Sequence, residues 1–445
     1  MKWADAWMPA GRIGSKMCVE LSRWCTIGKQ HEPLCVHIPL NEESEVSRLP
    51  FDASRLGQAG IMGILVLALM IFFQFITGSH MLASANLQNI VTGNAHIFVL
   101  AIGMVLVVTI GQLDLSVGSV AAFSSMSTAI IIANLGLPWW VGLLLGMLIG
   151  AFVGLIQGLF VAKVGLPAFI VTVGGMIILR GGVQWESQAL SVPVPHGFQT
   201  LGSGYLPSWG SIFGIDTATV IVGVITAVVA VTSIVRTYLR RRARLGLQGV
   251  DYRPWVKSAI VVVLVGVFTW LFGTGREGTS FPVPGVMVLV LIFIYHFMST
   301  RTQFGRHLQA VGGNIQAASL SGVHVTKIQC LVMVNMGILS ALAGMMFAGR
   351  ATAAGPQDGL LWELEAIAAV FIGGAAVAGG RGSVFGAVLG ATLMAVLSNG
   401  LLLVGLGSDR AQVVKGIVLL AAVTLDVYGK KQSPLHELSR TQFSF

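Results

Sequence analysis

Long apolar segments dominate this sequence and limit its fold more than any other feature. A helix needs about 20 apolar residues to cross the roughly 30 Å hydrocarbon core of a bilayer. Twelve runs of about this length occur, some of them interrupted by Gly or Pro, and they lie near residues 58–78, 95–111, 115–134, 139–162, 167–183, 217–235, 258–273, 285–299, 328–349, 364–378, 383–405 and 411–428. The runs predict an all-α, polytopic membrane protein with about 10–12 transmembrane helices. The short fifth and tenth runs are candidates for broken or half-membrane helices.

The composition excludes two other classes of protein. Only 10% of the residues are charged and 55% are hydrophobic, whereas a soluble domain uses about 25% charged residues. A cytosolic enzyme is therefore excluded. The net charge of +9 does not indicate a nucleic-acid-binding protein, because the basic residues lie between the apolar runs, where they act as topology signals.

The basic residues predict the orientation of the chain in the membrane. With twelve crossings and a cytoplasmic N-terminus, all but five of the 27 Lys and Arg residues fall in the tails or in inside loops. The five exceptions are Arg180, Arg276, Arg350, Arg410 and Lys415. The loop over 236–257 is the most basic. Because cytoplasmic loops are enriched in Lys and Arg, both termini are predicted to be cytoplasmic.

Three regions follow from the pattern of hydropathy. Residues 1–55 are expected to be a disordered cytoplasmic tail, residues 56–430 the transmembrane domain, and residues 431–445 a cytoplasmic C-terminal tail. The N-terminal tail holds Cys18, Cys25 and Cys35 together with His31 and His37. A metal site is the alternative there, but the cysteine spacings match no zinc pattern.

Glycines recur every four residues in two of the runs. At 3.6 residues per turn, this spacing leaves a bare groove along one side of a helix, against which another helix packs closely. The first series is Gly142, Gly146, Gly150, Gly154 and Gly158, and the second is Gly382, Gly386 and Gly390. Helix packing alone explains both series. A functional alternative is that such surfaces let helices slide or tilt during a transport cycle, and one series in each half hints at an internal repeat.

A polar stretch, Gln112-Leu-Asp114-Leu-Ser116-Val-Gly118-Ser119, interrupts apolar sequence that would otherwise run from 97 to 133. An Asp at membrane depth is costly unless it pairs, faces water or caps a helix. One interpretation is that Asp114 and Ser116 cap a helix that begins at Leu115. The other is a broken helix whose polar ends line the path of a hydroxylated substrate.

Other polar residues are scattered at membrane depth. Each one alone is typical of an interhelical hydrogen bond, but together they suggest the sparse lining of a cavity for a neutral polar solute. The candidate pathway residues are Gln112, Asp114, Ser116, Gln157, Thr172, Asn335 and Asn399; His96, Glu363, Glu365 and Ser398 are further polar groups at this depth. There is no row of carboxylates as in a proton relay and no intramembrane Arg cluster for anions. No catalytic, cofactor-binding or metal residue is predicted.

The segment over 301–325, after the eighth run, has the features of a short docking helix. Gly312 and Gly313 predict a turn, Asn314 is a typical N-cap, and Gly322 predicts the end of the helix. Small side chains on neighbouring turns follow the cap: Ala317, Ala318, Ser321 and Gly322. A short cytoplasmic helix with such a face suits a groove in another protein, and a plain connecting loop is the alternative.

Four motifs resemble those of the membrane permease subunits of bacterial monosaccharide ABC importers of the ribose and xylose type. They are Gln112-Leu-Asp-Leu-Ser-Val-Gly118, Pro167-Ala-Phe-Ile-Val-Thr-Val-Gly174-Gly-Met176 with Arg180-Gly181, Phe304-Gly305-Arg306 with Ala310-Val-Gly-Gly-Asn314, and Ile372-Gly-Gly374 with Ala378-Gly-Gly380. The resemblance covers about residues 58–430. The additional apolar pair around the basic loop is closer to the xylose and multiple-monosaccharide branch.

This resemblance implies a function and a set of partners. The segment over 304–325 would be a cytoplasmic coupling helix that docks on a separate ABC ATPase, which binds ATP-Mg, while this chain carries no cofactor. The coupling residues would be Phe304, Gly305, Arg306, Gly312, Gly313, Asn314, Gln316, Ala317, Ala318, Ser321 and Gly322. An extracytoplasmic sugar-binding protein and a second permease chain, forming a homodimer in the bacterial inner membrane, would complete the transporter. The family usually has Glu where this chain has Gln316, which puts any ionic contact at that position in doubt.

Two further observations bear on the energy source. No Gly-x4-Gly-Lys-Ser/Thr phosphate loop occurs, so ATP would be hydrolysed by a partner. The alternative is a self-sufficient secondary transporter or facilitator, which would need paired ionisable residues within the membrane and no docking segment. A membrane enzyme is disfavoured, because no His, Asp and Glu residues have catalytic or metal spacing.

Overall fold

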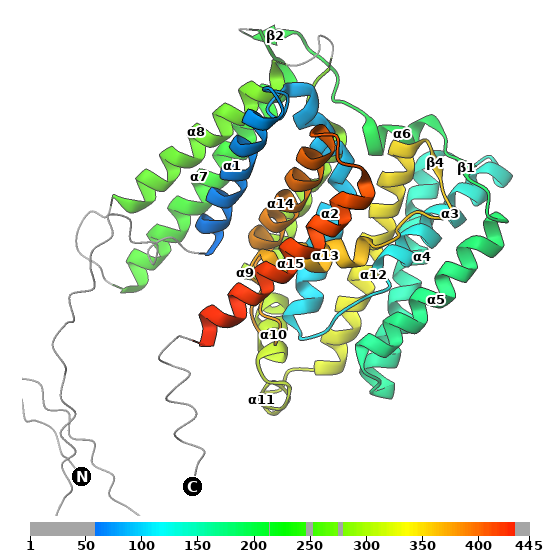
Figure 1. Ribbon diagram of the computed structural model, residues 1–445. Coiled ribbons are helices and arrows are strands. Elements are labelled where there is room, and N and C mark those ends of the chain that lie inside the picture. Colours follow the sequence, from blue (N-terminus) through cyan, green and yellow to red (C-terminus); the bar gives the residue numbers. More distant parts are fainter. Residues whose placement is uncertain (1–57, 213, 246–251, 275–278, 432–445) are drawn as a thin grey trace, which may run out of the picture. The chain divides into compact units, whose positions relative to one another are not determined.

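The computed structural model describes residues 58–212, 214–245, 252–274 and 279–431. The predicted N-terminal tail, with its cysteines and histidines, lies outside these ranges, and so does almost all of the predicted C-terminal tail. The described part is built almost entirely from helices (Figure 1). The prediction of an all-α polytopic membrane protein is confirmed.

Every one of the twelve apolar runs forms a helix. The long helices are α1 (Gln58–Ile76), α2 (Ser84–Thr109), α3 (Val117–Leu135), α4 (Trp139–Leu159), α5 (Ala168–Ser187), α7 (Thr217–Leu245), α8 (Arg253–Gly273), α9 (Val283–Arg301), α12 (Val325–Ala351), α14 (Val384–Leu403) and α15 (Ser408–Lys431). The short ones are η2 (Phe160–Val164, a π-helix), α6 (His196–Ser203), α10 (Gln303–Gly313), α11 (Ile315–Leu320) and α13 (Trp362–Ile372). Within the described ranges, nine helices are long and apolar enough to span a bilayer.

The two runs that the sequence marks as short have different outcomes. The fifth run forms α5, whose 20 residues are enough for a crossing. The tenth run forms α13, which has only 11 residues and is roughly 16 Å long at 1.5 Å per residue. A helix of that length crosses about half of the hydrocarbon core, so α13 is the half-membrane helix of the pair.

Helices α2 and α12 form the centre of the structure. Every residue over 95–109 of α2 is buried, and α12 packs against α2, α3, α4 and α6. A helix that is apolar on all sides is expected in the interior of a helical bundle. The α7–α8 pair packs mainly on itself and reaches the rest through α2.

The glycines of α4 form one buried stripe. Gly142, Gly146, Gly150, Gly154 and Gly158 are all buried. A Cβ atom on Gly142 would overlap Ile132 of α3, whereas one on Gly150 or Gly154 would overlap the backbone carbonyl of Gly337 or Met333 in α12. The stripe therefore lets α4 approach α12 backbone to backbone.

The second glycine series differs from its prediction. Gly386 and Gly390 lie in α14 and contact the backbone of α13, at Gly373 and Ala369. Gly382 is not helical, because α14 begins only at Val384. It lies instead in the connection after α13, against Thr109 of α2.

Two very short sheets lie at the end of the molecule opposite α10 and α11 (Figure 1). Strand β1 (Val192–Pro193) pairs antiparallel with β4 (Ala353–Ala354), and β2 (Ser211–Ile212) pairs with β3 (Ile215–Asp216). The β1–β4 pair ties the segment after α5 to the segment after α12. The connection that leads into α13 is thus fixed at its start.

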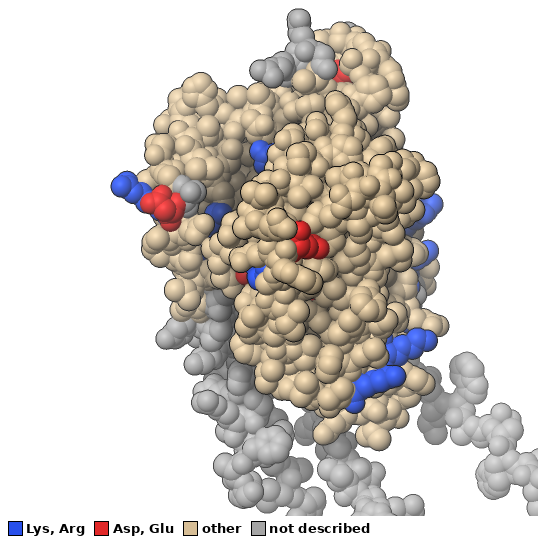
Figure 2. All heavy atoms as spheres, turned by 90° about the vertical axis from the view of Figure 1, so that its right-hand side faces the viewer, with Lys and Arg blue, Asp and Glu red and all other residues tan. Residues whose placement is uncertain are grey.

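The outward faces of α4 and α5 are apolar. Leu148, Phe152, Ile177, Ile178 and Trp185 are largely exposed. Figure 2 views the molecule from the side on which these helices lie and shows few charged side chains there. Exposed apolar surface of this extent is expected where lipid or another membrane subunit covers a helix.

Gly150 provides a test of the close contact between α4 and α12. The change Gly150→Ala places a Cβ against the Gly337 carbonyl and the Ala341 side chain, so we expect a lower melting temperature in detergent, followed by tryptophan fluorescence. Gly266→Ala in α8 is the matched control, since no atom lies within 4 Å of its added Cβ. Equal melting temperatures for the two variants would contradict the role assigned to the stripe.

Candidate functional site

The chain leaves the helical path between α2 and α3, over residues 110–116. Helix α2 ends at Thr109, and Gly111 takes a positive φ of 76°, a conformation that favours glycine. Helix α3 begins only at Val117. Non-helical backbone at membrane depth is tolerated where it is buried in protein or lines a cavity.

Asp114 organises this break through its own backbone. Its Oδ1 accepts hydrogen bonds from the Ser116 backbone N–H (2.8 Å) and from Ser116 Oγ (2.6 Å). The predicted cap of a helix starting at Leu115 is therefore wrong, because Asp114 closes a turn before the helix and contacts none of the N–H groups of α3. The alternative interpretation, a broken helix, agrees with the non-helical backbone over residues 110–116.

Residues of α4 and α5 complete the polar cluster, which we define as Asp114, Ser116, Gln157 and Thr172. Gln157 Nε2 donates a hydrogen bond to Ser116 Oγ at 2.9 Å, while the one hydroxyl proton of Ser116 is donated to Asp114. Thr172 Oγ1 accepts from the Leu115 backbone N–H at 3.2 Å. All four residues are buried. Four of the seven predicted pathway residues thus come together.

A charged group lies beside this cluster and was not predicted as part of the pathway. Glu363, at the start of α13, is only 8% exposed, and its Oε2 has no hydrogen-bond partner in the described part of the chain. It lies next to Gly118 of α3 and within electrostatic reach of Arg180 and Asp114. The sequence signal was Glu363 at the beginning of an unusually short apolar run.

Arg180 fixes the turn that leads into α13. Its Nη1 donates to the Asp358 carbonyl at 2.6 Å, and the Asp358 side chain accepts from the Gly355 N–H at 2.8 Å. On the opposite side, Gly359 and Gly118 touch backbone to backbone. The turn therefore connects α3, α5 and α13 around the polar cluster.

The remaining predicted pathway residues lie apart from the cluster or have no bonded partner in it. Asn335 accepts a hydrogen bond from the Tyr295 hydroxyl (2.5 Å), and Asn399 pairs with Asn86 at 2.9 Å in both directions. These contacts are ordinary interhelical hydrogen bonds. Gln112 lies in the break, with its Oε1 buried and unpartnered among the described residues.

The chemistry of the polar cluster suits a neutral, hydroxylated molecule. Hydroxyl and amide groups both donate and accept hydrogen bonds, and the Asp114 carboxylate accepts them. No group of three or more His, Cys, Asp or Glu residues in the described ranges is arranged to hold a metal ion.

The segment over 302–325 forms two helices at one end of the molecule (Figure 1). Thr302 caps α10 by accepting from the Gly305 N–H at 3.3 Å, and Asn314 caps α11 by accepting from the Ala317 N–H at 2.9 Å. Gly322 follows with a positive φ of 83°. The predicted Asn314 cap and Gly322 break are confirmed, but the predicted turn at Gly312 and Gly313 is wrong, since both residues are helical in α10.

The surface of α11 and its flanks is largely open. Ala318 is buried against the protein, whereas Gln316, Ala317, Ser321 and Gly322 are exposed. Leu320 is 91% exposed. An apolar side chain projecting from a short capped helix is a feature of a surface that binds another protein.

Helix α10 contacts the base of the break directly. A Cβ on Gly312 would overlap the Thr109 carbonyl, which itself accepts a hydrogen bond from the Gly380 N–H at 2.8 Å. Gly379 lies against Gly111 in the same place. This glycine junction, made of Gly111, Gly312, Gly379 and Gly380 around Thr109, joins α10 to the end of α2.

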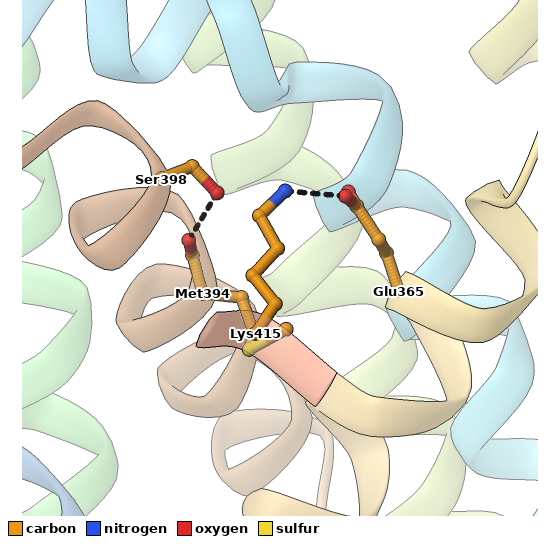
Figure 3. A network of polar contacts seen from close by, with 4 residues as sticks. All are labelled: Glu365, Met394, Ser398 and Lys415. Carbon is orange, nitrogen blue, oxygen red and sulfur yellow. Dashed lines mark hydrogen bonds and ion pairs between the residues drawn. The ribbon is translucent and has the colours of Figure 1, made fainter. Parts of the chain in front are cut away.

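An ion pair joins α13 to α15 (Figure 3). Lys415 Nζ lies 2.5 Å from Glu365 Oε1, and the two side chains are 17% and 28% exposed. Beside them, Ser398 Oγ donates to the Met394 carbonyl of its own helix at 2.8 Å. Lys415 is one of the five basic residues that do not follow the positive-inside rule. Its ion pair with Glu365 is the physical reason that a Lys occurs at this position.

We expect the change Lys415→Met to destabilise the folded chain. It leaves the Glu365 carboxylate mostly buried without its cation, and breaking such a pair costs about 3–5 kcal/mol. Thermal unfolding in detergent measures the effect. The exchanged double variant Lys415→Glu with Glu365→Lys should recover most of the lost stability, and a double variant no more stable than Lys415→Met would contradict the assignment.

Comparisons with known proteins place the chain in a family. The family described as the branched-chain amino acid transport system permease component matches residues 86–423. The chain is 34% identical over 378 residues to the xylose transport system permease protein XylH of Escherichia coli strain K12, covering 84% of this chain and 93% of the relative. No solved structure matches the chain significantly.

Two other relatives give the same result. The xylose transport system permease protein XylH of Haemophilus influenzae is 35% identical over 379 residues, covering 84% of this chain and 97% of the relative. The ribose import permease protein RbsC of Bacillus subtilis is 30% identical over 387 residues, covering 86% and 97%. The chain therefore belongs to the transport-system permease family that includes these xylose and ribose permeases.

Proposed function

We propose that this chain is the membrane-spanning subunit of an ATP-driven importer for a monosaccharide such as xylose. The similarity to the two xylose permeases along nearly their whole length carries this proposal. The polar cluster supports it independently, because hydroxyl, amide and carboxyl groups are the kinds that hydrogen-bond to sugar hydroxyls. ATP-Mg is bound and hydrolysed by a partner ATPase, and this chain holds no cofactor.

The segment over 304–325 is the coupling element in this proposal. The exposed face of α11 docks on the ATPase, and α10 relays its movement to α2 through the glycine junction. Gly312 contacts Thr109 there, five residues before Asp114 in the polar cluster. A displacement of α10 is thereby delivered to the base of the break.

The complete transporter contains further subunits. An extracytoplasmic sugar-binding protein delivers the sugar at the end that carries β2 and α6, and a second copy of this chain forms the other half of the passage. The chain lies in the bacterial inner membrane with both termini cytoplasmic. Its permease domain is 56–430, and the predicted tails over 1–55 and 431–445 fall almost wholly outside the described residues.

A substitution at the glycine junction separates the coupling role of α10 from its role in folding. We expect Gly312→Ala to reduce xylose uptake by proteoliposomes at least about tenfold, because the new methyl group overlaps the Thr109 carbonyl. Gly266→Ala in α8, outside the coupling segment, is the control, since nothing lies close to its added Cβ. Both are measured in the complex with the ATPase and the binding protein. Equal uptake by the two variants would contradict the relay through α10.

Docking itself needs a separate measurement. Ala317→Glu places a charged side chain on the exposed face of α11, so we expect it to abolish co-purification of the ATPase while the melting temperature of the chain stays unchanged. If the chain alone moves xylose into liposomes without an ATPase, and Ala317→Glu has no effect, the chain is a facilitator or secondary transporter.

The second uptake prediction concerns the polar cluster. Gln157→Leu removes the amide that donates to Ser116 and that, in this proposal, bonds to a sugar hydroxyl; losing one such bond of about 0.5–1.5 kcal/mol corresponds to a roughly 2- to 13-fold loss of sugar uptake. Ser398→Ala in α14 is the control, because its hydroxyl bonds only to its own helix. Unchanged uptake with Gln157→Leu would remove the cluster from the substrate pathway.

A further inference from the structure

A groove of about 660 Å³ opens at the end of the molecule that carries α10 and α11. It lies between the end of α4, η2, the end of α11 and the first turns of α12. Its walls are mainly apolar and include Leu159, Ala162, Val323, Val325 and Leu331. The groove borders the proposed coupling segment, but its walls in α4, η2 and α12 have no role in the function proposed above.

Two lysines lie on the rim of the groove. Lys163 belongs to η2 and Lys327 to the first turn of α12, and both are exposed. His324 also lines the groove, and no Asp or Glu does. Among the described residues, neither lysine has a carboxylate partner. The rim thus carries positive charge without a protein counterion.

The π-helix explains how Lys163 reaches this position. In η2 the backbone bonds span five residues instead of four, which widens the turn and rotates the following side chains around the axis. Gly165, with φ of 81°, then ends the helix. The widened turn occurs at the end of a membrane-spanning helix, at the level where lipid headgroups meet the hydrocarbon core.

We propose that this groove binds an anionic phospholipid. One acyl chain lies along the apolar walls, and the phosphate lies between the ammonium groups of Lys163 and Lys327. Basic pockets between membrane helices on the cytoplasmic side recognise anionic headgroups in this way. A lipid supplies both an acyl chain for the apolar walls and an anionic phosphate for the two lysines, so the shape and the charge of the groove fit one molecule.

Lipid binding in this groove is separate from transport, and it would regulate the docking segment through direct contact. Ser319 and Gly322 of the docking segment also line the groove, so a bound lipid touches the end of α11. Lipid binding is a property of this chain alone and is measured without the ATPase. Its failure therefore leaves the importer proposal untouched, and failure of the importer proposal leaves the lipid site to be tested.

The test measures lipid retained by the full chain in nanodiscs that contain phosphatidylglycerol and phosphatidylcholine, by native mass spectrometry after extraction. We expect the chain to retain phosphatidylglycerol selectively, and the double variant Lys163→Gln with Lys327→Gln to reduce retention about tenfold or more. The matched control, Arg240→Gln with Lys257→Gln, removes two charges from α7 and α8 and should retain the lipid.

A second variant tests the apolar part of the site. Ala162→Trp fills the groove without changing its charge, so it should also lower retention, while the melting temperature verifies that the chain is folded. Three results would overturn the proposal: equal retention of both lipids, equal loss in the charge control, or displacement of the lipid by inorganic phosphate alone. Loss of ATPase binding in Ala162→Trp with unchanged lipid retention would assign the groove to the ATPase instead.

Discussion

Backbone-to-backbone contact at glycine positions is the interaction on which the rest of this structure depends. Inside a bilayer, lipid tails are as apolar as leucine side chains, so helices associate through close packing rather than through burial of apolar surface. Gly150 and Gly154 bring α4 against α12, and Gly386 and Gly390 bring α14 against α13. Because α4 carries Gln157 on the same buried face as its glycines, this packing also sets the position of the amide that reaches Ser116.

The second constraint is that non-helical backbone within the membrane must be hydrogen-bonded. The break over 110–116 meets this requirement through side chains, with Asp114 accepting from the Ser116 N–H and Thr172 from the Leu115 N–H. The connection between α13 and α14 meets it partly through α2, since the Gly380 N–H donates to the Thr109 carbonyl. The two irregular segments are therefore supported at a shared point, which is also where α10 makes its contact.

Sequence patterns predicted the helices well because apolar length and glycine spacing are local properties. The Asn314 cap and the Gly322 break were also predictable, since each acts within one helical turn. Partners across the fold were not predictable in this way. The spacing of residues in the sequence does not show that Gln157 bonds to Ser116. Nor does it show that Asn399 pairs with Asn86 and lies apart from the polar cluster. The sequence did not predict that Gly312 is helical. Glycine is needed at this position because of the tight contact with Thr109, and not because of a local preference for a turn.

The ionisable groups in the described part bear on the source of energy. An ion-coupled carrier needs carboxylates that can exchange partners within the membrane. Here Glu365 is held by Lys415, and Asp114 is held by Ser116. Among the described residues, only Glu363 presents a buried carboxylate oxygen without a hydrogen-bond partner, and it has Arg180 within electrostatic reach. One such group is too few for a relay across a bilayer. In the proposed importer the energy enters instead from a partner ATPase, and α10, through its contact with Thr109, links α11 to the end of α2 beside the polar cluster.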